Sequence, residues 1–129
     1  MRIVTFSNYT AHTQPIFIEL NVLPFNKLVI QRIGLQMFKY RNHTVPTAIA
    51  DMFISNNLIH THNTRQQSNL RQPVGKQEYM YRNFSFVGVY IWNYIQNKTN
   101  INVLTSYHTY KINLKQYLLH NDTIQFRII

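Results

Sequence analysis

The residues best suited to binding chemistry are basic and aromatic, and most of them lie in the middle of the chain. Basic side chains neutralise phosphates, and tyrosine rings stack on unpaired bases. The first set consists of Arg65, Arg71, Lys76 and Arg82, interleaved with Tyr79 and Tyr81. A second basic stripe, made of His108, Lys111 and Lys115, is expected on one side of a helix near the end of the chain. Both sets favour contact with nucleic acid. The alternative is an ordinary solvated face whose tyrosines belong to the core.

The charge balance points to the same kind of partner. The 129 residues include 13 Lys and Arg against 4 Asp and Glu, which gives a formal net charge of +9. Such an excess favours polyanions, and we expect sequence-nonspecific binding of RNA or DNA.

The acidic residues argue against catalysis by carboxylates. Glu19, Asp51, Glu78 and Asp122 are scattered, whereas two-metal phosphoryl transfer and glycoside hydrolysis both need carboxylates brought close together. We therefore expect no enzyme activity in this chain, no catalytic residue and no cofactor.

Two histidines form a weaker candidate. On a strand, His60 and His62 would share one face, and neutral imidazoles bind Zn²⁺ or Cu²⁺. A zinc site needs three or four protein ligands, and the chain has no cysteine. We therefore interpret the pair as polar loop residues and expect no metal, with a histidine-based metal-binding protein as a remote alternative.

The apolar pattern predicts the elements that must hold these residues. Helices are expected at about 13–20, 24–41, 46–54, 85–95 and 105–119, for example from the stripe of Ile30, Ile33 and Met37. The segment 56–76 is polar, and a structureless loop of that length is uncommon in a compact domain. We therefore predict strands at about 67–71 and 79–83. The expected fold is α+β: one mainly helical domain over 1–122 with a small β-hairpin or strand pair, followed by a tail at 123–129.

Targeting signals are absent from the sequence. The first residues lack the apolar stretch of a secretory signal, and no run of about 20 apolar residues could span a membrane. We expect a nuclear or cytoplasmic protein that is not secreted and has no membrane partner.

The order of several motifs resembles one protein family. The patterns are Leu23-Pro24-x3-Leu28, Met37-Phe38-Lys39-Tyr40, Pro46-x6-Phe53-x2-Asn56-x3-His60-x-His62-x-Thr64-Arg65-x4-Leu70-x2-Pro73, Gly88-x2-Ile91-Trp92-Asn93 and Lys111-x2-Leu114-x2-Tyr117-Leu118-Leu119. Together they resemble the carboxy-terminal region of reverse transcriptases from non-LTR retrotransposons of animals, over about residues 2–121. The family usually has Leu-Pro where Tyr94-Ile95 follows Asn93, and Phe-Lys in place of Tyr110-Lys111.

The resemblance implies a piece from the end of a larger RNA-directed DNA polymerase, beyond its catalytic core, with the upstream polymerase domains as partners. The family-pattern positions are His60, His62, Thr64, Arg65, Trp92, Asn93 and Lys111. We interpret Trp92 and Asn93 as core and helix-end residues. Arg65, next to Thr64, either contacts a phosphate or locks a turn by bonding backbone carbonyls. The piece either binds template RNA or target DNA, or it packs on the polymerase thumb as a scaffold without touching nucleic acid.

Overall fold

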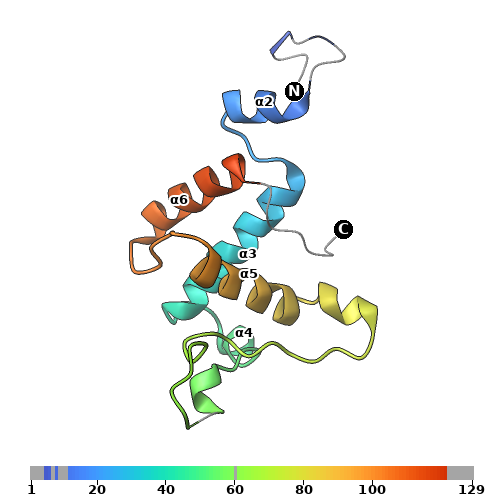
Figure 1. Ribbon diagram of the computed structural model, residues 1–129. Helices are drawn as coiled ribbons and strands as arrows, with labels where there is room; N and C mark the ends of the chain where they lie inside the picture. Colours follow the sequence, from blue (N-terminus) through green and yellow to red (C-terminus); the bar gives the residue numbers. More distant parts are fainter. Residues whose placement is uncertain (1–4, 7, 9–11, 60, 122–129) are drawn as a thin grey trace.

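The structure is a computed structural model, and it describes residues 5, 6, 8, 12–59 and 61–121. Five α-helices and two 3-10 helices follow one another in these residues (Figure 1). The elements are α2 (Thr13–Glu19), α3 (Phe25–Arg41), α4 (Thr47–Ala50), η1 (Asn56–Leu58), η2 (Glu78–Arg82), α5 (Phe84–Lys98) and α6 (Tyr107–His120). Compared with the expected ranges, α4 is shorter than 46–54 and α5 is longer than 85–95. The expected tail at 123–129 lies outside the described residues.

The predicted β-hairpin is wrong, because the described residues contain no strand and no sheet. Residues 79–82 belong to η2, where the ring of Tyr81 packs edge-on against Phe86 of the next helix, 5.4 Å between centroids. Residues 67–71 make only an isolated antiparallel bridge, between Leu70 and Ser55. The strand pattern failed because a short alternation of polar and apolar residues forms a strand only when a partner strand can take its backbone groups.

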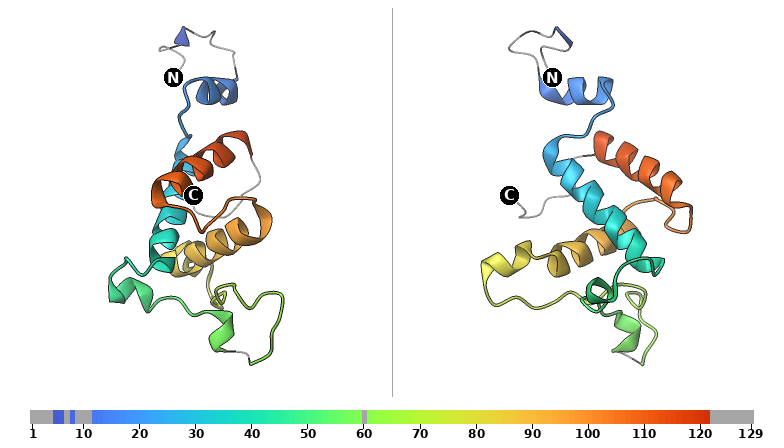
Figure 2. Two further views of the ribbon diagram at one scale, coloured as in Figure 1. Left: turned by 90° about the vertical axis from the view of Figure 1, so that its left-hand side faces the viewer. Right: turned by 180° about the vertical axis from the view of Figure 1, so that it is seen from behind.

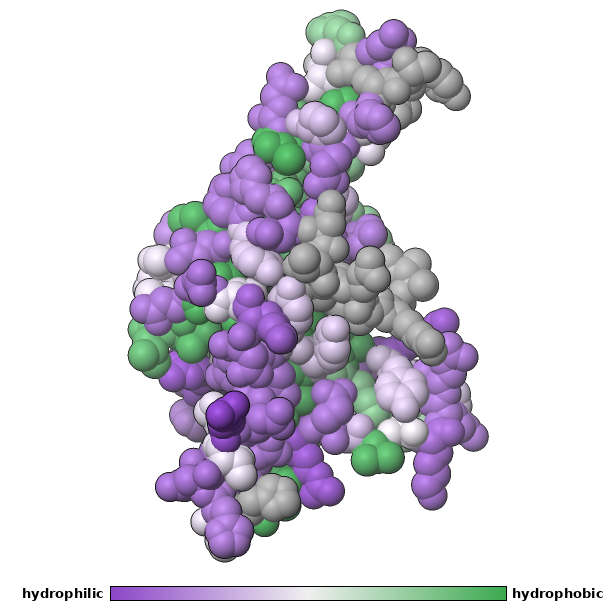
Figure 3. Space-filling model, viewed as in Figure 1, coloured by the Kyte–Doolittle hydropathy of each residue, from purple (hydrophilic) through white to green (hydrophobic). Residues whose placement is uncertain are grey.

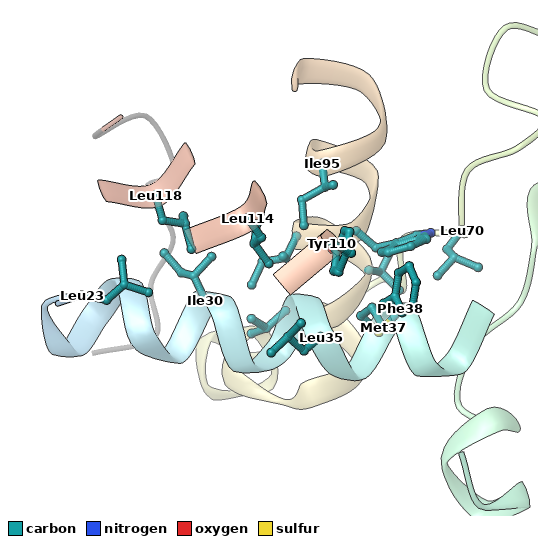
Figure 4. Packing of buried hydrophobic residues seen from close by; sticks show 14 of the residues in the cluster. Leu23, Ile30, Leu35, Met37, Phe38, Leu70, Ile95, Tyr110, Leu114 and Leu118 are labelled. Carbon is teal, nitrogen blue, oxygen red and sulfur yellow. The ribbon is translucent and has the colours of Figure 1, made fainter. Parts of the chain in front are cut away.

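The core lies where α3, α5 and α6 cross (Figure 4). Helix α3 presents apolar residues at i, i+3, i+4 and i+7 spacing, as the sequence predicted, and α6 faces it with a similar stripe. Helix α5 is buried on most of its circumference because α3 and α6 cover one side and the chain around 70–75 crosses another. The side chains at this crossing include Ile30, Met37 and Phe38 of α3, Val89, Ile91 and Ile95 of α5, and Tyr110, Leu114 and Leu118 of α6.

Two glycines allow the helices to approach closely. A Cβ atom on Gly34 of α3 would lie 2.9 Å from Cδ2 of Leu114 and 3.3 Å from Cδ1 of Ile95. A Cβ atom on Gly88 of α5 would lie 2.9 Å from Sδ of Met37. Glycine weakens a helix by about 1 kcal/mol relative to alanine, so its presence in two helix interiors follows from this close packing.

Helix α2 projects from one end of this core (Figures 1 and 2). Ile16 is its one buried residue, and the chain continues through Asn21, whose φ of 52° is left-handed, into α3. At the other end of α3, His43 closes the helix with a φ of 57°, while Thr44 donates its N–H to Lys39 O at 3.0 Å. The polar middle of the chain therefore lies at the opposite end of α3 from α2.

Tyr110 joins the three-helix crossing by a hydrogen bond as well as by packing. Its ring is fully buried and stacks on Phe38, with 4.5 Å between the centroids, and its hydroxyl donates to the carbonyl of Gly34 at 3.3 Å. Burial raises the pKa of Tyr110 well above its ordinary value of 10.0. Burial also raises the pKa of Tyr40.

These tyrosines predict a loss of stability in alkaline solution. Above about pH 10 the unfolded chain ionises Tyr110 while the folded chain keeps the proton. The folded state then binds more protons, so the free energy of unfolding falls by up to about 1.4 kcal/mol per pH unit for this one group. Urea denaturation from pH 8 to 11 measures this slope.

Tyr110→Phe should lose about 1 kcal/mol at neutral pH, because it lacks the hydrogen bond, but its alkaline slope should be shallower. Part of the pH dependence should remain in this variant, because burial also raises the pKa of Tyr40. Tyr79→Phe, which removes an exposed phenol, is the matched control. Parallel pH profiles for wild type and Tyr110→Phe would contradict the assignment.

Candidate nucleic-acid interface

A polar loop, residues 56–69, carries the strongest candidate residues. Its two ends are joined by backbone hydrogen bonds: Asn56 donates to Asn69 O at 3.0 Å, and Arg71 donates to Ile54 O at 2.7 Å. The Asn56 side chain also reaches across the loop and donates to Gln66 O at 3.1 Å. Since the buried side chains of Phe53 and Leu70 flank it, the loop is anchored at both ends although it has almost no core of its own.

Asn93 holds this loop against α5. Its side-chain oxygen accepts from Leu70 N at 3.0 Å, and its side-chain nitrogen donates to Leu70 O at 2.9 Å. A neighbouring bond joins Nδ2 of Asn97 to Oδ1 of the buried Asn69 at 3.2 Å. Asn93 lies inside α5, five residues before its end, so the expectation of a helix-end residue is wrong. Trp92 is buried, as expected of a core residue.

Thr64 and Arg65 lie at the exposed tip of the polar loop. They line two adjoining open hollows of about 490 and 330 Å³, whose other lining residues are Asn56 and Gln66 in the first and Asn57, Gln67 and Ser68 in the second. The turn at the tip is closed by backbone bonds, such as Gln67 N to Thr64 O at 3.1 Å. Among the described residues the guanidinium of Arg65 has no partner. The described residues therefore show no bond from Arg65 to a carbonyl of this turn, which is the bond that the turn-locking hypothesis requires.

The other basic candidates divide into two groups. Arg71, Lys76 and Arg82 are exposed between the polar loop and α5. Lys111 and Lys115 are half-buried on α6, which lies toward the other end of the molecule (Figures 1 and 2). The structure therefore does not gather all of the predicted basic residues on one surface.

The two predicted stacking residues differ in their surroundings. Tyr79 is exposed, whereas Tyr81 is held between its contact with Phe86 and a hydrogen bond to Gly75 O at 3.3 Å. Because both belong to a 3-10 helix, they do not share the strand face that the sequence suggested.

The structure adds no support for a metal site built on the two histidines. His62 is exposed at the loop, and His60 lies outside the described residues. Within the part of the chain that the structure describes, no three His, Asp or Glu residues are grouped as metal ligands would be. None of the described helices is long and apolar enough to cross a membrane.

The part of the chain that contains the polar loop has few acidic residues. Between Met52 and Asn121 the sequence has seven Lys and Arg residues and one acidic residue, Glu78. The lower end of the molecule, where the polar loop lies in Figure 1, is mainly hydrophilic on the face shown in Figure 3. The polar loop holds one of these basic residues, Arg65, and the segment after it adds Arg71, Lys76 and Arg82. This anchored stretch can contact the phosphates of a nucleic acid.

The two hydrogen bonds between the Asn93 side chain and the Leu70 backbone, which we call the Asn93 clamp, predict a local effect of mutation. Asn93→Ala removes two hydrogen bonds and leaves the N–H and C=O of Leu70 without their partner. The free energy of unfolding should therefore fall by about 2 kcal/mol. The polar loop should loosen first, and trypsin should cleave after Arg65 and Arg71 faster, before sites in α3. Asn97→Ala, which loses a single side-chain bond, is the control and should change both readouts much less. Equal cleavage in the two variants would contradict a clamp at Asn93.

The comparisons with known proteins leave the family open. The chain matches no family model, no curated protein and no solved structure. Its likeness to reverse transcriptases of non-LTR retrotransposons is therefore a hypothesis, and the physical grounds for a function are the exposed basic residues Arg65, Arg71, Lys76 and Arg82.

Proposed function

We propose that the chain is a non-catalytic carboxy-terminal piece of a retrotransposon RNA-directed DNA polymerase that helps to bind the backbone of template RNA or target DNA. It would act in the nucleus or cytoplasm, together with the upstream polymerase domains. The motif order supports the family, and the charge of +9 supports the partner.

One observation carries the binding proposal. From Met52 to Gln77 the chain has no acidic residue, and Asn93 fixes this stretch to α5 so that Arg65, Arg71 and Lys76 are exposed. Because the clamp orders the backbone before any ligand arrives, less conformational entropy is lost on binding. Contacts of this kind recognise phosphate and carry little base specificity.

The first test is the salt dependence of binding to single-stranded RNA. If Arg65, Arg71, Lys76 and Arg82 each neutralise one phosphate, the log–log slope of affinity against salt should be about −2.8. Arg65→Gln should weaken binding to all sequences alike and make the slope shallower by about 0.7. Arg32→Gln makes the same charge change at an exposed site on α3 and serves as the control. A salt-independent affinity, or the same loss of affinity in both variants, would rule out the basic residues of 65–82 as the binding surface.

The scaffold hypothesis is favoured by a different observation. Apolar side chains are exposed where α2 projects from the core and α3 begins, namely Ile18, Val22, Phe25 and Leu28. Phe25 alone is 69% exposed. Exposed apolar side chains gathered in one part of the chain are typical of a contact with another protein or domain, and here the upstream thumb would be that domain.

The scaffold hypothesis predicts self-association of the isolated chain. Sedimentation velocity over a range of protein concentrations should show oligomers, and Phe25→Asp should make the chain monomeric. Leu104→Asp changes an equally exposed apolar residue outside this surface and should leave the oligomers in place. A wild-type chain that stays monomeric at high concentration would contradict the hypothesis.

A further inference from the structure

A groove runs along the outer side of α5, away from the helix crossing. It has a volume of about 330 Å³, and its lining residues are Gln72, Tyr90, Asn93, Tyr94, Asn97 and Lys98. One wall is α5, on which positions 90, 94 and 97 or 98 lie one turn apart on a single face. The other wall is the chain after Leu70, which runs past Asn93 toward Phe86, as the bonds of Leu70 and the closeness of Gly75 to the Phe86 ring show.

The groove offers aromatic surface beside one basic side chain, that of Lys98. The ring of Tyr90 is 40% exposed, and Tyr94, one turn further on, is half-buried with its hydroxyl 3.2 Å from that of Tyr117. Asn93 forms the floor, since both ends of its amide are bonded to Leu70. The rim residues Gln72, Asn97 and Lys98 are exposed.

These features fit one class of ligand. A tyrosine ring on the surface can stack on a base only when that base is not already stacked in a duplex. The amide of Gln72 can hydrogen-bond base edges or sugars, and the Lys98 ammonium can neutralise a phosphate. None of the lining residues is acidic, so nothing in the groove repels a polyanion.

We propose that this groove binds unpaired bases of single-stranded nucleic acid, with Tyr90 as the stacking residue and Lys98 as a phosphate contact. The proposal rests on the proposed nucleic-acid function and deepens it in two respects. It places a base contact on α5, away from Tyr79 and Tyr81, and it makes the preferred partner single-stranded.

The test is fluorescence anisotropy with a short labelled oligothymidine, a duplex of the same length and an oligomer of abasic sites. Tyr90→Ala should weaken binding to oligothymidine about tenfold, because stacking on one base is worth roughly 1–3 kcal/mol. Tyr90→Phe keeps the ring and should bind as wild type does. Tyr107→Ala, at a tyrosine of nearly equal exposure on α6, is the matched control and should retain the affinity.

The abasic oligomer separates base contact from every other effect. It keeps the phosphates and has no bases, so Tyr90→Ala and wild type should bind it equally. Lys98→Gln should instead make the salt slope shallower by about 0.7 on both single strands. Because Lys98 is exposed, this variant tests the groove even if Tyr90→Ala folds poorly.

The outcomes distinguish the two proposals. If wild type binds oligothymidine with a steep salt slope but neither Tyr90→Ala nor Lys98→Gln changes binding, the groove proposal is wrong and the backbone-binding function stands. A loss of affinity in Tyr90→Ala that persists on the abasic oligomer also overturns the groove proposal, as does tighter binding to the duplex than to oligothymidine. A wild-type chain that binds neither these three nucleic acids nor single-stranded RNA overturns both proposals.

Discussion

The contact on which the rest of the structure depends is the close approach of α3 to α5 and α6 at Gly34. A Cβ atom there would lie 2.9 Å from Cδ2 of Leu114 and 3.3 Å from Cδ1 of Ile95, so these buried side chains would have to shift to make room for it. At the same crossing the hydroxyl of Tyr110 donates a hydrogen bond to the carbonyl of Gly34. A methyl group at this position would favour the helix by about 1 kcal/mol, yet overpacking a filled core typically costs about 1–3 kcal/mol. The packing term therefore outweighs helix propensity and sets where α5 lies.

The position of α5 in turn sets the position of the binding residues. The polar loop has too few apolar side chains to fold by itself, so it is held by buried neighbours and by the amide of Asn93. One face of α5 thus belongs to the core, and the other carries both the Asn93 amide that holds Leu70 and the groove that Asn93 helps to line. A binding surface supported by a buried helix loses less entropy on contact with a ligand than a free loop of the same composition.

The helices could be predicted from the sequence because their apolar residues recur with helical spacing, and each stripe proved to face the core. The predicted strands did not form, because a short alternation such as Tyr79 to Arg82 needs a partner strand for its backbone groups. The backbone N–H and C=O of Leu70 are bonded to the side chain of Asn93 instead. The role of Asn93 has no local signature, because its partner is 23 residues away. Its place in a family pattern identified the residue without revealing its contact.

The two candidate roles of this chain use opposite ends of the molecule. Phe25 begins α3, and the polar loop follows its far end, so the 17 residues of the helix separate the two surfaces by about 25 Å. This exceeds the Debye length of about 8 Å at physiological salt, so charge on the loop has little effect on a contact at α2. Docking through the apolar end would leave the polar loop and the α5 groove uncovered. A scaffold contact and a nucleic-acid contact are therefore physically compatible in one chain, and each can be abolished without the other.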